Sequence, residues 1–125
     1  MPFEIIWEPY GAYKRFYGFV TASEFKQSIE KLHNDLRFDI LKYSINDYLG
    51  VQGHEITGID VTMFAALGIG ASFSNPNIRI ASVTTEERIL EFLQSYATTQ
   101  LEPSHLGAFS NVADARTWIK GELAQ

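Results

Sequence analysis

Alternating hydrophobic and polar residues dominate the first twenty positions of the chain. Residues 3–7 and 12–17 are rich in aromatic and β-branched side chains, which favour strands. A Pro-Gly turn at 8–11 separates the two runs, so we predict an antiparallel hairpin. Alternation places the side chains of the second strand on two faces: Tyr13, Arg15 and Tyr17 on one, Lys14 and Phe16 on the other.

Helical spacing of apolar residues replaces this alternation after three capping signals. Capping boxes at 21–24 and 84–87 predict two helix starts, and Ser110-Asn111 predicts a third. Apolar residues follow each start at intervals of three or four, which is typical of helices with one buried face. The three sets are Phe25, Ile29, Leu32 and Leu36; Ile89, Leu93 and Tyr96; and Val112, Ala115, Trp118, Ile119 and Leu123.

The remaining segments complete an alternating order. Residues 39–46, 78–83 and 105–109 predict three further strands, and a helix capped at 57–60 is expected to run to about Phe73. The order is therefore β-β-α-β-α-β-α-β-α. Such an order predicts a single α/β domain over residues 1–125, with a mixed, mostly parallel sheet of about five strands flanked by about four helices.

Composition limits the classes of function. The formal charge of −5 and the lack of a basic stripe beyond Lys14-Arg15 disfavour nucleic-acid binding, which depends on clustered Lys and Arg. The chain has no cysteine, which excludes disulfides and thiolate zinc sites and suits a reducing compartment. No basic n-region precedes Glu4, so we expect no secretory signal and a cytoplasmic location.

The predicted second helix is apolar on almost every side from Val61 to Phe73, so it should be buried on more than one side. It is shorter than the ~20 residues that span a bilayer, and we expect no membrane span. Gly68 and Gly70 indicate an early helix end or close approach by another backbone. Two interpretations stay open: an internal helix, or a surface for a second copy, a partner or a lipid. The candidate interface residues are Met63, Phe64, Leu67, Ile69 and Phe73.

Three strings give the chain a resemblance to a known family. Residues 15–21 resemble a strand that ends in Gly before a Thr-capped helix, residues 43–47 a central strand that ends on an Asp, and residues 108–119 a closing strand and helix. Together they resemble the STAS superfamily, and most its bacterial SpoIIAA-like (STAS/SEC14-like) branch. The resemblance spans nearly the whole chain. It implies a non-enzymatic domain for protein docking, or for nucleotide or lipid binding.

Anti-sigma-factor antagonists of that superfamily are switched by phosphorylation of a Ser or Thr that follows an Asp at the start of the second helix. The matching string here is Asp60-Val61-Thr62. Val61 has no hydroxyl at the usual acceptor position, and the family pattern does not extend to Thr62. We therefore expect no phosphate on this chain.

Polar residues around the start of the second helix are the candidate binding site. The free amides near Gly58 attract anions, although Asp60 is expected to cap those amides itself. His54-Glu55 lies in a Gly-flanked loop past the third strand, where open α/β sheets often bind ligands. The candidate set is Asp47, His54, Glu55, Thr57, Gly58, Asp60 and Thr62. No HExxH, Gly-x-Ser-x-Gly, P-loop or GxGxxG string is present, and we expect neither cofactor nor metal.

Three hypotheses follow. The leading one is a non-enzymatic SpoIIAA-like docking module that forms a homo-oligomer or binds another protein through the second helix. The alternative is a carrier of a small apolar or lipid-like ligand, enclosed by that helix and the aromatic hairpin. A third is an enzyme that uses His54 or Glu55 in proton transfer.

Overall fold

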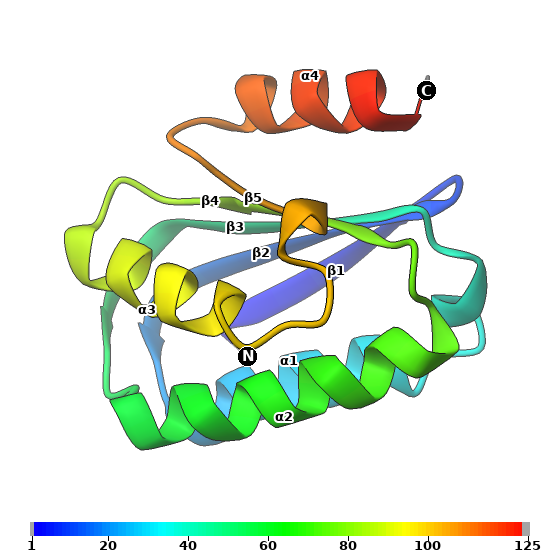
Figure 1. The fold of residues 1–125 in the computed structure, drawn as a ribbon. Helices are drawn as coiled ribbons and strands as arrows, with labels where there is room; N and C mark the ends of the chain where they lie inside the picture. The colour runs from blue at the N-terminus through cyan, green and yellow to red at the C-terminus, as the bar shows by residue number, and fades with distance from the viewer. Residues whose placement is uncertain (1, 124–125) are drawn as a thin grey trace.

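The computed structural model describes residues 2–123, in which five strands form one mixed sheet (Figure 1). The strands lie side by side in chain order, with β1 antiparallel to β2 and all later neighbours parallel. The predicted class and element order are confirmed. The strands are β1 (Phe3–Glu8), β2 (Gly11–Val20), β3 (Tyr43–His54), β4 (Arg79–Val83) and β5 (Leu106–Phe109).

Four α-helices cover the sheet unequally (Figure 1): α1, α2 and α3 pack on one face and α4 packs on the other. None of the helices within residues 2–123 is long and apolar enough to cross a membrane. The helices are α1 (Ala22–His33), α2 (Gly58–Ser74), α3 (Glu87–Ala97) and α4 (Val112–Leu123), with short 3-10 turns η1 (Phe38–Ile40) and η2 (Pro103–His105).

Side-chain caps fix where the helices begin. The Thr21 hydroxyl accepts from the Glu24 amide at 3.1 Å, and the Glu24 carboxylate accepts from the Thr21 amide at 3.0 Å, so the predicted capping box is confirmed. The predicted box at 84–87 is wrong. Glu86 is itself the N-cap of α3 and accepts from the Ile89 amide at 2.9 Å. The Thr84 hydroxyl instead accepts from the Glu86 amide, which leaves residues 84–86 outside the helix.

The predicted end of the first helix is also wrong. Its stripe was expected to reach Leu36, but α1 ends at His33 and Asn34 is its C-cap. Leu36 consequently lies 98% exposed in the turn before η1. Apolar spacing alone does not mark a helix end, because one more residue at the right interval extends the pattern without adding contact to the core.

The third strand differs most from the prediction. Residues 38–40 form η1, and β3 starts at Tyr43 and continues through Gly50 and Gly53 to His54, which was expected in a loop past the strand. Arg15 pairs with Asp47 but Val20 with His54, so β3 carries two more residues than β2 across that stretch. A Cβ on Gly50 would lie 2.9 Å from the Phe16 carbonyl oxygen, so this glycine permits a bulge rather than a turn. The bulged ends of β2 and β3 curve toward α2 (Figure 1).

Aromatic side chains join the sheet to α1 and α2. The Phe16 ring stacks on Phe25 of α1 at 5.3 Å and on Tyr48 of β3 at 5.0 Å. Phe25 in turn packs against Phe64 of α2 at 4.8 Å. α2 packs against both α1 and α3, but its outer face is exposed at Ile59 and Phe73, so the interpretation of α2 as an internal helix is wrong.

Candidate functional site

A cavity of about 290 Å³ lies between the sheet and the helices α1, α2 and α3. Protein interiors normally leave few voids larger than a water molecule, and ligand sites begin at about 300 Å³. The space is therefore of the size that a small ligand fills. Its apolar wall includes Phe16, Phe25, Phe64, Ile89 and Leu93.

A polar row crosses the sheet at the floor of this cavity. Lys14 of β2 is the register partner of Asn46 of β3, and Asn46 is that of Ser82 of β4. All three line the cavity, on the sheet face that carries Phe16. The Ser44 hydroxyl donates to the Asn46 Oδ1 at 3.0 Å. Tyr48 of β3 lines the cavity beside this row, and its hydroxyl hydrogen-bonds Asn46 and Ser82.

Lys14 is the unusual member of this row. Its exposed fraction is 3%, and no hydrogen bond or ion pair found among residues 2–123 involves its ammonium group; the nitrogen is not among the fully enclosed polar atoms and so borders the cavity. The nitrogen lies 5.6 Å from the centroid of the Phe16 ring, which is a weak partner for a buried charge. Burial accordingly lowers the pKa of Lys14 from 10.5 to about 7.

His33 at the end of α1 also lines the cavity, and the charge of Lys14 affects its pKa. Its ring packs on Phe38 at 4.9 Å. Burial, and after it the positive charge of Lys14, lowers the pKa of His33 to about 4. At neutral pH the imidazole is therefore uncharged, and a histidine side chain, neutral or cationic, cannot act as a counter-ion to the ammonium group.

The segment between α3 and β5 marks where the cavity reaches the surface. Leu101 and Glu102 line the cavity and are exposed, while His105 in η2 is half-buried. Deeper in, Tyr96 of α3 lies over α2, where a Cβ on Gly68 would come within 2.0 Å of its hydroxyl oxygen. Gly68 thus allows close approach by a side chain of α3, rather than by a backbone or at an early helix end.

The predicted site residues at the start of α2 do not converge on one ligand position. His54 lines the cavity, with its Nδ1 accepting from the Ile56 amide at 3.2 Å, whereas Glu55 is exposed outside the cavity wall. The Thr57 amide donates to Asp60 at 2.8 Å, which completes a capping box. The helix amides are thus occupied by the chain itself, as the capping interpretation predicted. Gly58 and Thr62 are exposed in the first turns, where the Thr62 hydroxyl donates to the Gly58 carbonyl at 3.1 Å.

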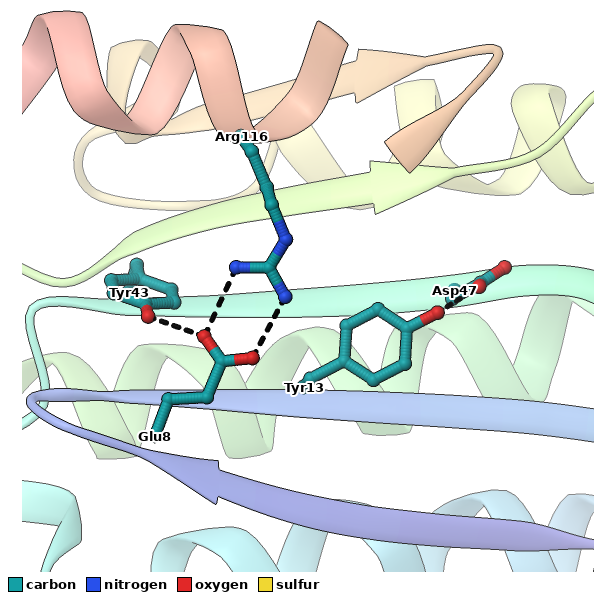
Figure 2. Close-up of polar contacts among 5 residues, drawn as sticks. All are labelled: Glu8, Tyr13, Tyr43, Asp47 and Arg116. Carbon is teal, nitrogen blue, oxygen red and sulfur yellow. Dashed lines mark hydrogen bonds and ion pairs between the residues drawn. The ribbon is translucent and has the colours of Figure 1, made fainter. Parts of the chain in front are cut away.

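Asp47 is absent from the cavity wall and lies beside Tyr13 (Figure 2), whose ring packs on the sheet face that α4 covers. Its carboxylate accepts a hydrogen bond from the Tyr13 hydroxyl and another from the Leu49 amide, the latter at 2.9 Å. Burial, and then the bond to Asp47, raises the pKa of Tyr13 to about 12. Asp47 is thus separated from the other predicted site residues by the sheet.

A second polar group on this face joins α4 to the β1–β2 hairpin (Figure 2). Arg116 of α4 donates to both carboxylate oxygens of Glu8, at 3.0 and 2.7 Å, and Tyr43 donates to the same carboxylate. The hydrogen bond from Arg116 holds the pKa of Glu8 below its ordinary value. An open depression beside this group is lined by Tyr43, Arg116 and Lys120, among others, but its arginine is already paired.

The predicted interface residues of α2 divide between its two sides. Met63 and Phe73 are exposed at 42% and 79%, and Leu67 and Ile69 are half-buried. Phe64 is 3% exposed and packs against Phe25 inside its own chain, so it is not on the outer face. Within the part of the chain described, no group of three or more His, Cys, Asp or Glu side chains gathers as metal ligands do.

Sequence reasoning missed Lys14, Asn46 and Ser82 as site residues. The available signal was the strand alternation, which placed Lys14 on the face of Phe16, where a charged side chain is exceptional. Asn46 and Ser82 are aligned with Lys14 only through the register of β2, β3 and β4, which local sequence does not specify.

No known protein-family model matches this chain, and no curated protein matches it. The resemblance to SpoIIAA-like domains therefore remains a prediction that depends on the strings at 15–21, 43–47 and 108–119.

Proposed function

We propose that this protein binds a small, largely apolar molecule in the cavity between its sheet and the helices α1, α2 and α3. The observation that carries the proposal is the cavity itself, about 290 Å³ in a domain of 125 residues. An empty apolar space of this size destabilises a fold by the dispersion contacts that its wall lacks. A bound molecule would restore those contacts.

This proposal favours the ligand-carrier alternative over the docking module that led the sequence analysis. Lipid binding is among the roles that the resemblance to the SpoIIAA-like branch implies. The pair on which the enzyme hypothesis depends does not meet at the cavity wall: His54 reaches the wall, but Glu55 is exposed outside it. A binding role without catalysis is therefore the function that we propose.

Fluorescence of a neutral apolar dye, N-phenyl-1-naphthylamine, tests the proposal. We expect saturable binding of one dye per chain. Leu93 lines the cavity, so Leu93→Trp should fill it and abolish binding. The matched control is Leu90→Trp on the same helix, whose side chain is half-buried outside the cavity wall and whose variant should bind normally. Absence of saturable binding to the natural chain, or equal binding by both variants, would contradict the proposal.

A second candidate function is self-association through α2, favoured by the pattern on its outer face. Exposed apolar or small residues recur there at intervals of four and three, the spacing of paired helices: Ile59, Met63, Ala66, Gly70 and Phe73. The small central residues would let a second α2 approach closely. Light scattering after size exclusion should show a dimer that Met63→Glu dissociates. A monomer at high concentration would contradict self-association and leave the cavity proposal unaffected.

A further inference from the structure

We infer that the ligand of the cavity is an amphipathic organic acid whose carboxylate binds the ammonium group of Lys14. This inference rests on the proposed function and names the chemical class of the molecule. Three observations carry it: a buried charge without a partner, a row of donors around it, and an apolar chamber beyond it.

The first observation is the isolation of Lys14. An ammonium group removed from water is strongly destabilising unless a counter-charge or hydrogen-bond acceptors replace the solvent. Lys14 is 3% exposed and lines the cavity, and the ion pairs found over residues 2–123 do not include it. The side chain is therefore positioned to receive an acceptor that the chain does not supply.

The second observation is the character of the neighbouring polar groups. Asn46 and Ser82 continue the row from Lys14 across the sheet, and their amide and hydroxyl groups, which also hydrogen-bond the Tyr48 hydroxyl, face the same space. The acidic residue on the cavity wall is Glu102, which is exposed near the opening, where its carboxylate accepts from the Ser104 hydroxyl at 2.7 Å. A positive, donor-rich floor matches a carboxylate, which accepts at both oxygens and forms short, strong bonds to an ammonium group.

The third observation indicates the chemical character of the rest of the ligand. Beyond the polar row the wall is aromatic and aliphatic, formed by side chains such as Phe25, Phe64 and Leu93. The volume of about 290 Å³ corresponds to about ten water molecules at ~30 Å³ each. An aliphatic chain of about that many carbon atoms would fill the chamber, so a medium-chain fatty acid is a suitable probe.

The experiment compares decanoate with 1-decanol, which has the same chain and an uncharged head, as competitors of bound N-phenyl-1-naphthylamine at pH 6.5. We expect decanoate to displace the dye from the natural chain at least about tenfold more effectively than decanol, as an ion pair in a buried site should produce. Lys14→Met should remove this preference while it keeps binding of the dye and of decanol. Met has a similar shape and no charge, and Lys14→Gln, which keeps a polar head, provides a second neutral variant.

The control is Lys42→Met, which removes an exposed lysine and should leave the decanoate preference intact. Equal displacement by decanoate and decanol from the natural chain, or an undiminished decanoate preference in both Lys14 variants, would overturn the inference. Either result leaves dye binding in place, so it is distinguishable from failure of the proposed function, in which the dye itself does not bind.

Discussion

The two faces of the sheet differ in how they accommodate charge. Beneath α4, Glu8 is held by Arg116 and Asp47 accepts from Tyr13, so the acidic groups have partners within the chain (Figure 2). Beneath α1, α2 and α3, Lys14 faces an open cavity. A charge whose partners are internal holds elements together, whereas a charge that lacks them is available to a ligand. The sheet thus has a structural face and a face to which we assign the proposed ligand.

The largest expected effect comes from removal of the unpaired charge. Burial lowers the pKa of Lys14 from 10.5 to about 7, so the native state disfavours the charged form of this side chain. Lys14→Met removes that cost and should raise the free energy of unfolding by roughly 3–5 kcal/mol at pH 7. Urea denaturation measures this gain. The exposed Lys42→Met control should change stability by less than about 0.5 kcal/mol. A destabilised Lys14→Met variant would mean that the lysine has a structural partner after all.

The pH dependence of that gain sharpens the comparison. Between pH 7 and 10.5 the unfolded chain binds a proton at Lys14 that the native chain has released, so the stability contributed by this site rises with pH and is flat below 7. The advantage of Lys14→Met should therefore shrink by roughly 2 kcal/mol between pH 7 and 9. Paired denaturation curves at the two values measure this change.

Other titrating groups on the cavity wall should interfere little with that measurement. His33 is already neutral above pH 7, because burial and the charge of Lys14 lower its pKa to about 4. Burial raises the pKa of Tyr48 above the pH range of the experiment, and raises the pKa of Tyr96 to about 12. An advantage that stays constant with pH would show that Lys14 keeps an ordinary pKa in the native chain.

On the structural face, removal of a charged side chain should lower the free energy of unfolding instead of raising it. Asp47→Ala should lower the free energy of unfolding by about 2 kcal/mol, because it leaves the Tyr13 hydroxyl and the Leu49 amide without their acceptor. Tyr13→Phe, which removes the donor but keeps the ring, should lower it by about 1 kcal/mol. Urea denaturation again provides the measurement, with the exposed Asp39→Ala as control. Equal stability of Asp47→Ala and the control would remove the distinction between the two faces.

The smallest effect is expected at the partly exposed pair of Glu8 and Arg116. Arg116→Met should lower the free energy of unfolding by about 1 kcal/mol or less, and added salt should reduce the difference. The pKa of Glu8 in the native chain lies below its ordinary value. The pair therefore stabilises the native chain fully at pH values above the ordinary pKa of Glu8. This stabilisation is lost as the pH falls through the lowered native pKa.

NMR titration of Glu8 should show its pKa rising in Arg116→Met. Arg116→Lys keeps the charge without the two parallel hydrogen bonds, and the Glu8 pKa in that variant should lie between the other two. An unchanged Glu8 pKa in Arg116→Met would show that the two side chains do not interact in solution.

The fold was largely predictable because local signals agree with the final packing. The capping box at Thr21 and Glu24 and the alternation around Phe16 determine a helix start and a strand face from a few neighbouring residues. The bounds of the third strand were mispredicted for the opposite reason. Gly50 resembles a turn locally, and only the neighbouring carbonyl of Phe16 shows why a strand needs glycine there.

The site was less predictable because its parts are far apart in sequence. Lys14, Asn46 and Ser82 lie on three strands, and their alignment depends on register. The predicted site followed motifs at the start of α2, where the polar groups satisfy one another, as Thr57 and Asp60 do. Local motifs identify helix caps well, because a cap is itself local, whereas a cavity is a property of the assembled layers.

Gly68 bears on the shape of the cavity and so on the proposed ligand. The Tyr96 hydroxyl occupies the place of the side chain that Gly68 lacks. A larger residue at 68 would have to displace the Tyr96 hydroxyl and the Gln100 side-chain oxygen, both on residues of the cavity wall. Position 68 would then influence which molecular shape the chamber accepts, whereas Lys14 would bind the head group of the proposed ligand.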